Sequence, residues 1–212
     1  MRERILIAFL ALSLPVAAAA QQVVDRIVAR VDSEVITQSE VDELGHFQQL
    51  VDGKQQSAEE RLTELVEQWM INREASFSGF HAPRAAAVQK AYASLEKRFG
   101  TPEAFARQLK AVGLSQDEVR KMLGRQLFLS GYLDYKFRPE VQVNEKDIED
   151  YYQKTLVPEL KSKGQPLPPL DSVADQVREL LIERGVSRLS AEWLNQMQER
   201  WKVERIGGPE SP

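Results

Sequence analysis

The sequence predicts a mainly α fold: a multi-helix bundle with a small β-sheet formed by an N-terminal hairpin and a C-terminal strand. Three observations predict it. Between residues 39 and 200, apolar side chains recur mostly every three to four positions, the period of a helix buried on one face. Residues 23–31 and 34–37 are rich in β-branched side chains and are separated by a two-residue turn, as in a hairpin. Residues 201–206 alternate apolar and polar side chains, as strands do.

The strand at 201–206 requires a partner, because a buried backbone N–H or C=O group without one costs free energy. The only other segment with strand character is residues 23–37. We therefore expect the two ends of the mature chain to pair. The pairing would close the helical body as one small sheet.

The first helix is expected to begin at Ser39, a residue type that caps helices well. Glu40 and Asp42 follow in the first turn, where negative charge interacts favourably with the helix dipole. The pattern runs to about Leu50, and Gly53 marks the end of the helix.

Two later helices begin with a capping box, in which a Ser and the Glu three positions on bond each other's backbone N–H groups. Ser57 with Glu60 begins the second helix, which is expected to end near Gly79. Ser115 with Glu118 begins the fifth, which is the longest apolar pattern in this half of the chain.

Glycine and proline mark the remaining boundaries. The third helix follows Pro83 and stops at Gly100. The fourth has Pro102 at its first position and ends at Gly113. Arg138 and Pro139 break the fifth helix, because the residue before a proline is disfavoured in the α conformation.

The C-terminal third contains two more helices and a linker. A helix is expected over residues 144–161, with Pro158 as the place for a kink. Residues 164–169 are rich in glycine and proline and indicate a linker. The last helix starts near Asp171 and carries a ladder of apolar residues that is interrupted at Gly185.

Residues 1–20 have the three parts of a removed secretory signal: two arginines near the start, an apolar run over 5–14 and small residues at 18–20. We place the cleavage before Gln21. The apolar run is shorter than the roughly 20 residues that span a bilayer. The alternative is an uncleaved amphipathic anchor. A lipid anchor on cysteine is excluded, because the chain has no cysteine.

The composition disfavours several classes of function. The chain has 28 Lys and Arg against 32 Asp and Glu, and loss of residues 1–20 leaves 26 against 31, a net charge of −5. No basic patch is present, so nucleic acid and anionic membranes are poor partner candidates. Disulfides and thiolate metal sites are excluded. His46 and His81 lie 35 positions apart without other His or Cys nearby, so we expect no metal or other cofactor.

No catalytic constellation is visible. Pairs of adjacent carboxylates occur in predicted helices, among them those at 59–60, 117–118 and 149–150. Neighbours on a helix point about 100° apart and do not converge on one substrate atom. Motifs for phosphate loops, serine nucleophile elbows and zinc hydrolases are absent. We therefore expect no enzyme activity from the residues themselves.

The order of segments resembles a known family. Val-Val-Asp-Arg-Ile-Val-Ala-Arg-Val at 23–31 and Val-Ile-Thr-Gln-Ser-Glu-Val at 35–41 follow an export signal and precede a helical bundle. This resembles the N-terminal domain of the SurA family of periplasmic chaperones for outer-membrane proteins. Further similar segments are 62–77, 99–114, 120–137 and 192–204. The resemblance as a whole extends over nearly all of residues 22–206.

The chain departs from that family in its middle. Members usually carry one or two parvulin-type prolyl isomerase domains of mixed α/β structure, each about ninety residues long, between the helical body and the last helix. Only residues 138–171 are available here, and no histidine follows His81. The predicted organisation is a signal peptide at 1–20, a helical chaperone domain at 21–137, a helix and Pro-rich linker at 138–170, a returning helix and strand at 171–206 and a loose tail at 207–212.

The resemblance implies an ATP-independent holdase of the periplasm that binds unfolded outer-membrane polypeptides, without stable insertion into the membrane. Two alternatives remain open. One is a prolyl isomerase, by kinship alone. The other is a periplasmic adaptor or structural subunit with one fixed partner.

Aromatic and Met side chains on the second and fifth helices are the candidates for a client-binding groove, since they are large and adaptable. Apolar residues there cover more than one helix face, which indicates a central helix or a second face for a partner. Ordinary core packing is the alternative for each of them. The candidate residues are Trp69, Met70, Phe77, Phe128, Tyr132 and Tyr135.

Overall fold

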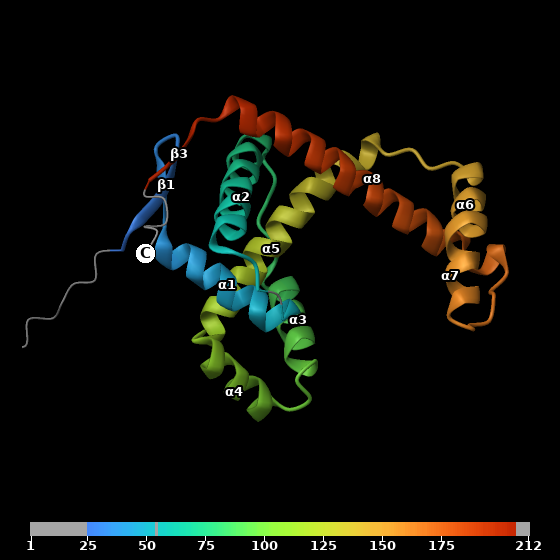
Figure 1. Ribbon diagram of the computed structural model, residues 1–212, viewed down its shortest axis with the longest axis horizontal. Coiled ribbons are helices and arrows are strands. Elements are labelled where there is room, and N and C mark those ends of the chain that lie inside the picture. The colour runs from blue at the N-terminus through green and yellow to red at the C-terminus, as the bar shows by residue number, and fades with distance from the viewer. Residues whose placement is uncertain (1–24, 54, 207–212) are drawn as a thin grey trace, which may run out of the picture.

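The computed structural model describes residues 25–53 and 55–206, and it confirms the mainly α fold with a small antiparallel sheet (Figure 1). The predicted signal peptide and the tail at 207–212 lie outside the described residues. The elements are β1 (Ile27–Val31), β2 (Glu34–Thr37), α1 (Gln38–Asp52), α2 (Ala58–Ser78), α3 (Ala85–Lys97), α4 (Pro102–Val112), α5 (Gln116–Phe137), η1 (Arg138–Glu140), α6 (Glu145–Tyr151), η2 (Tyr152–Leu156), α7 (Val157–Ser162), α8 (Leu170–Arg200) and β3 (Val203–Arg205).

The sheet has the order β2-β1-β3, so the C-terminal strand pairs with the first strand as expected. Ala29 lies opposite Arg205, and Val31 lies opposite Val203. Ala29 and Val31 are fully buried in the central strand. The N–H of Ile206 donates to the carbonyl of Val28 at 2.9 Å and extends the pairing by one residue.

Thr37, not Ser39, caps the first helix. Thr37 is in an extended conformation as the last residue of β2, and its side chain accepts from the N–H of Glu40 while the Glu40 carboxylate accepts from the N–H of Thr37. Ser39 lies inside the helix, and its N–H donates to Asp25 at 3.2 Å. The hairpin therefore runs directly into α1, and the strand end supplies the cap.

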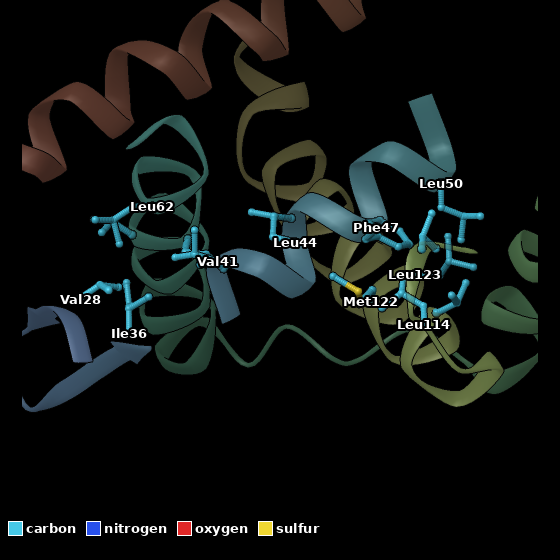
Figure 2. Close-up of a cluster of buried hydrophobic side chains, with 14 of the residues drawn as sticks. Val28, Ile36, Val41, Leu44, Phe47, Leu50, Leu62, Leu114, Met122 and Leu123 are labelled. Atoms are coloured by element: carbon cyan, nitrogen blue, oxygen red, sulfur yellow. The ribbon is translucent and has the colours of Figure 1, made fainter. Parts of the chain in front are cut away.

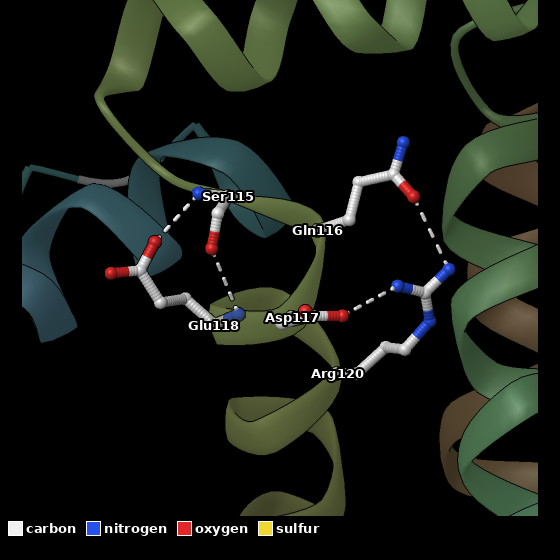
Figure 3. Close-up of polar contacts among 5 residues, drawn as sticks. All are labelled: Ser115, Gln116, Asp117, Glu118 and Arg120. Carbon is white, nitrogen blue, oxygen red and sulfur yellow. Dashed lines mark hydrogen bonds and ion pairs between the residues drawn. The ribbon is translucent and has the colours of Figure 1, made fainter.

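Both predicted capping boxes are present. At the start of α5, the N–H of Ser115 donates to the Glu118 carboxylate at 2.6 Å and the N–H of Glu118 donates to Ser115 Oγ at 3.2 Å (Figure 3). Ser57 and Glu60 repeat this pattern at the start of α2. The hydrogen bonds from the serine lower the pKa of each glutamate.

A single large apolar cluster joins the sheet to α1–α5 and to the end of α8 (Figure 2). Helix α5 is central, since it contacts α2, α3 and α8. This explains why its apolar residues cover more than one face. The buried members that Figure 2 labels are Val28, Ile36, Val41, Leu44, Phe47, Leu50, Leu62, Leu114, Met122 and Leu123.

The helix expected at 144–161 forms with a widened turn. Asn144 caps α6, and the π-helical turn η2 joins α6 to α7 just before Pro158. Proline has no N–H to donate, so the regular α pattern cannot continue through this position. The Pro-rich linker then returns along these helices, where Tyr152 Oη donates to the carbonyl of Pro168 at 2.6 Å.

Helix α8 is one uninterrupted helix, so Gly185 does not break it. The glycine is a packing position, because a β-carbon there would lie 2.5 Å from Val141 Cγ1. Arg138 also binds Glu179 of α8 through two hydrogen bonds of 2.7 and 3.1 Å. We call α6, η2, α7, residues 163–169 and the N-terminal half of α8 the arm, and the remainder the body.

Figure 1 shows the body and the α6–α7 part of the arm at opposite ends of α8. The structure describes every residue from 138 to 202, and this segment contains helices, turns and extended linker but no strand. A mixed α/β domain is therefore not present between α5 and β3.

Candidate binding pockets of the body and the arm

A pocket of about 420 Å³ lies in the body between α1, α2 and α5, with Leu194 of α8 also in its lining. Its volume falls within the range typical of ligand sites. Apolar side chains form much of its surface, and these are Leu44, Phe47, Val51, Ile71, Met122, Leu129, Leu133 and Leu194. Amide and charged side chains complete it, chiefly Gln48, Gln56, Glu64, Glu67, Gln68, Arg125 and Gln126.

The three helices build this body pocket in the same way. Each contributes residues at positions i, i+3, i+4 and i+7, which form one stripe along a helix. On α1 the stripe is Leu44, Phe47, Gln48 and Val51; on α2 it is Glu64, Glu67, Gln68 and Ile71; on α5 it is Met122, Arg125, Gln126 and Leu129. Each stripe mixes apolar and polar side chains, so the pocket has apolar and hydrogen-bonding surfaces side by side.

A hydrogen-bond network joins the polar residues of α1 and α2. Gln48 Nε2 donates to Gln56 Oε1 at 2.8 Å and to Glu64 Oε2 at 2.7 Å, and Gln68 Nε2 donates to Glu64 Oε1 at 3.1 Å. Gln48 is only 9% exposed, and its Oε1 accepts no hydrogen bond from the residues that the structure describes. An unsatisfied buried acceptor costs about 1–3 kcal/mol.

Glu67 has an altered titration. Burial raises the pKa of its carboxyl, and the nearby charge of Glu64 raises it further. The hydrogen bond from Gln198 Nε2 of α8, at 3.1 Å, acts in the opposite direction but does not cancel the effect. The lining of the pocket therefore holds two carboxylates that repel each other.

A second pocket, of about 630 Å³, lies in the arm between α6, α7, the Pro-rich linker and α8. Its lining is mostly apolar, and Leu167 of the linker is exposed at 43%. The lining residues are Tyr151, Leu156, Leu160, Gln165, Pro166, Leu167, Pro168, Val173, Gln176, Val177 and Leu180.

Three of the six predicted client-binding residues lie together. The ring of Phe80 packs against Phe128, Tyr132 and Tyr135, with centroids 5.4–5.7 Å apart. Gly131 makes this possible, because a β-carbon there would lie 3.3 Å from Phe80 Cζ. Tyr132 is buried and Phe128 is partly buried, while Tyr135 is 59% exposed. This cluster fixes the segment after α2 against α5.

The other three predicted residues are dispersed. Met70 is fully buried in the core. Trp69 packs edge-on against Trp201, with centroids 5.0 Å apart, and joins α2 to the end of α8. Phe77 is 73% exposed and lies under the guanidinium of Arg73. None of the six lines either of the two pockets.

The sequence reasoning missed the body pocket because it followed aromatic residues. The signal that marks the pocket is the recurrence of Gln48, Gln68 and Gln126 in helical stripes that combine apolar and polar residues. The two histidines are exposed. Within the described residues, no group of three or more His, Asp or Glu side chains is placed to hold a metal ion. In the same part of the chain, every helix is too short or too polar to cross a bilayer.

Comparison with known proteins adds no assignment: no protein-family model matches the chain, and no curated protein matches it.

Proposed function

We propose that the chain is an ATP-independent holdase of the periplasm that binds unfolded outer-membrane polypeptides. The observation that carries the proposal is that one rigid helix, α8, contributes to two largely apolar pockets, one in the body and one in the arm. The proposal keeps the function that the resemblance to the SurA family implies and places it in these two pockets. The periplasmic location rests on the sequence of residues 1–20 alone.

Each pocket is lined by at least one residue of α8. Leu180 lines the arm pocket and Leu194 lines the body pocket. They are fourteen positions apart, close to four helical turns, so they share a face and are separated by about 21 Å along the axis. An extended polypeptide covers that distance with roughly six or seven residues.

The spacing suits a transmembrane β-strand before it folds. Such strands have about 9–11 residues, alternate apolar and polar side chains and are rich in aromatics near the interfaces. One strand is therefore long enough to place one side chain in each pocket. Two weak contacts on the same chain raise the effective affinity through local concentration, without requiring either contact to be tight.

Holding the chain in this way prevents the edge-to-edge pairing that leads unfolded strands to aggregate. Micromolar affinity, about −8 kcal/mol, is sufficient for exchange without an energy source. Release then occurs when the client pairs its strands elsewhere. The mechanism uses no catalytic group, and the helical segment between α5 and β3 supports a holdase that does not isomerise prolyl bonds.

A competition experiment tests the proposal against an adaptor with one fixed partner. Several unrelated peptides that correspond to outer-membrane strands are allowed to compete with one fluorescent peptide for the full chain. The holdase proposal expects each to displace the probe. Binding of a single native protein, with no displacement by the peptides, contradicts it. Turnover in a peptidyl-prolyl assay would support the isomerase alternative.

A further inference from the structure

We infer that the body pocket selects segments in which a Lys or Arg lies within two residues of an apolar side chain. The inference rests on the proposed function, because it names the part of the client that the body pocket binds. Three features of the described residues carry it: two carboxylates without cationic partners among them, a buried acceptor without a donor among them, and an apolar surface beside these groups.

The carboxylates of Glu64 and Glu67 are held by neutral groups. Within the described part of the chain, Glu64 accepts from the amides of Gln48 and Gln68, and Glu67 accepts from the amide of Gln198. By contrast, Glu59 on the same helix forms an ion pair with Arg205.

The carboxylates of Glu64 and Glu67 share the lining of the body pocket with the guanidinium of Arg125, so these two acidic side chains outweigh that basic side chain. Partial burial strengthens the repulsion between Glu64 and Glu67, since charges interact more strongly where water is excluded. A cation placed between them relieves this repulsion.

Gln48 supplies the second, independent feature. Its Nε2 donates to Gln56 and Glu64, and its buried Oε1 accepts no hydrogen bond within 25–53 and 55–206. Turning the amide over does not solve the problem, because Oε1 would then face the Glu64 carboxylate. A bound donor reaches this oxygen only when the side chains that cover it move, because the atom is buried. Ammonium and guanidinium groups carry several N–H donors and no acceptor, so one such group bonds both carboxylates and, once Oε1 is uncovered, Gln48 as well.

The apolar surface selects the rest of the ligand. Phe47, Met122 and Leu129 lie in the same pocket as the carboxylates. The aliphatic stem of a Lys or Arg packs on such surface while its charged end reaches polar groups. The remaining volume accepts a neighbouring apolar side chain. A purely apolar segment does not relieve the repulsion between Glu64 and Glu67 and brings no donor for Gln48. A segment with acidic residues beside the apolar one adds a further repulsion against the two carboxylates.

The test uses two short fluorescent peptides that differ only in the residues beside one Phe, which are Lys in the first and Glu in the second. We expect the Lys peptide to bind the full chain more tightly by roughly three- to tenfold at low salt, with the difference decreasing as salt is added. The double variant Glu64→Gln, Glu67→Gln should remove the difference. The control Glu199→Gln, an exposed residue of α8 outside the pocket, should preserve it.

Equal binding of the two peptides, or a difference that survives the double variant, overturns the inference and leaves the holdase proposal in place. If the chain suppresses client aggregation but binds neither peptide, the inference is likewise overturned and the holdase proposal again stays in place. Failure of both peptides to bind, together with failure to suppress aggregation, overturns the inference and the proposed function.

Discussion

Gly185 in the middle of α8 lies directly against Val141, so close that a β-carbon on Gly185 would be 2.5 Å from Val141 Cγ1 and 2.9 Å from Cγ2. This contact is where the segment after α5 crosses α8. Arg138 and Glu179 join the same two segments nearby through their paired hydrogen bonds. The position of the arm therefore depends on the absence of a side chain at residue 185.

The first prediction concerns this crossing. Gly185→Ala should lower the free energy of unfolding by about 1 kcal/mol, because overpacking costs about 1–3 kcal/mol and exceeds the helix-propensity gain of up to about 1 kcal/mol. The control is Gly124→Ala in α5, where the added carbon meets only Val88 at 3.6 Å and the propensity gain should stabilise the protein. Urea unfolding of both variants measures this, and stabilisation by Gly185→Ala would contradict the packing role.

The second prediction concerns helix caps. Ser57→Ala and Ser115→Ala should each cost about 1 kcal/mol, because each removes the acceptor for the N–H of the third helical residue. The control is Ser94→Ala, an exposed position inside α3, where the change should be small or slightly stabilising. Thermal and urea unfolding give the comparison. Equal effects at all three positions would show that the capping boxes do not contribute.

The third prediction is a pH dependence at Glu67. Its folded pKa is raised above the unfolded value of 4.5, so the ionised carboxyl destabilises the fold near neutral pH. As pH falls through the raised pKa, the native state takes up a proton first and stability increases until pH reaches about 4.5. Glu67→Gln should therefore be more stable than the wild type at pH 7, with a smaller advantage at pH 4.5.

Glu60 and Glu118 should act in the opposite direction. Hydrogen bonds lower their pKa values below 4.5, so their contribution is present above that pH and is lost as pH falls further. Unfolding of the Glu67→Gln variant and the wild type across pH 3–7 separates the two effects. A constant difference across the range would show that Glu67 titrates normally.

The fourth prediction concerns the closure of the chain ends. Trp201 packs edge-on against Trp69 just before β3, and this contact joins α2, α8 and the sheet. Trp201→Ala should cost roughly 2–4 kcal/mol, because it removes a partly buried aromatic pair and loosens the edge strand. Phe77→Ala, at an exposed ring, should change stability by less than about 0.5 kcal/mol. Similar losses in both variants would contradict the closing role.

The sequence was most informative where structure is local. Ser57 and Ser115 cap the helices that they were expected to begin, because a cap depends on residues three positions away. Pairing of the chain ends could also be anticipated, since only one other segment had strand character. Thr37 was missed as a cap because it is also the last residue of β2, and α1 begins at the next residue without a loop between them.

Long-range contacts could not be predicted in the same way. The sequence suggested that the apolar ladder of the last helix is interrupted at Gly185. In the structure the glycine is required because Val141, forty-four positions earlier, packs directly against it. Met70 and Tyr132 were selected as client-binding candidates because their side chains are large and adaptable, but both are buried in the structure. The body pocket depends on stripes from three helices, and only their packing brings Gln48 and Glu64 together.

The most direct test of the central proposal is light scattering during dilution of a urea-unfolded outer-membrane β-barrel protein into buffer with the chain and no nucleotide. The account predicts that the wild type suppresses aggregation, that Leu167→Glu in the arm pocket weakens suppression, and that Phe77→Glu, an exposed apolar residue outside both pockets, does not. Unchanged scattering with the wild type would contradict the holdase. Loss of suppression in Phe77→Glu but not in Leu167→Glu would contradict the assignment to the pockets.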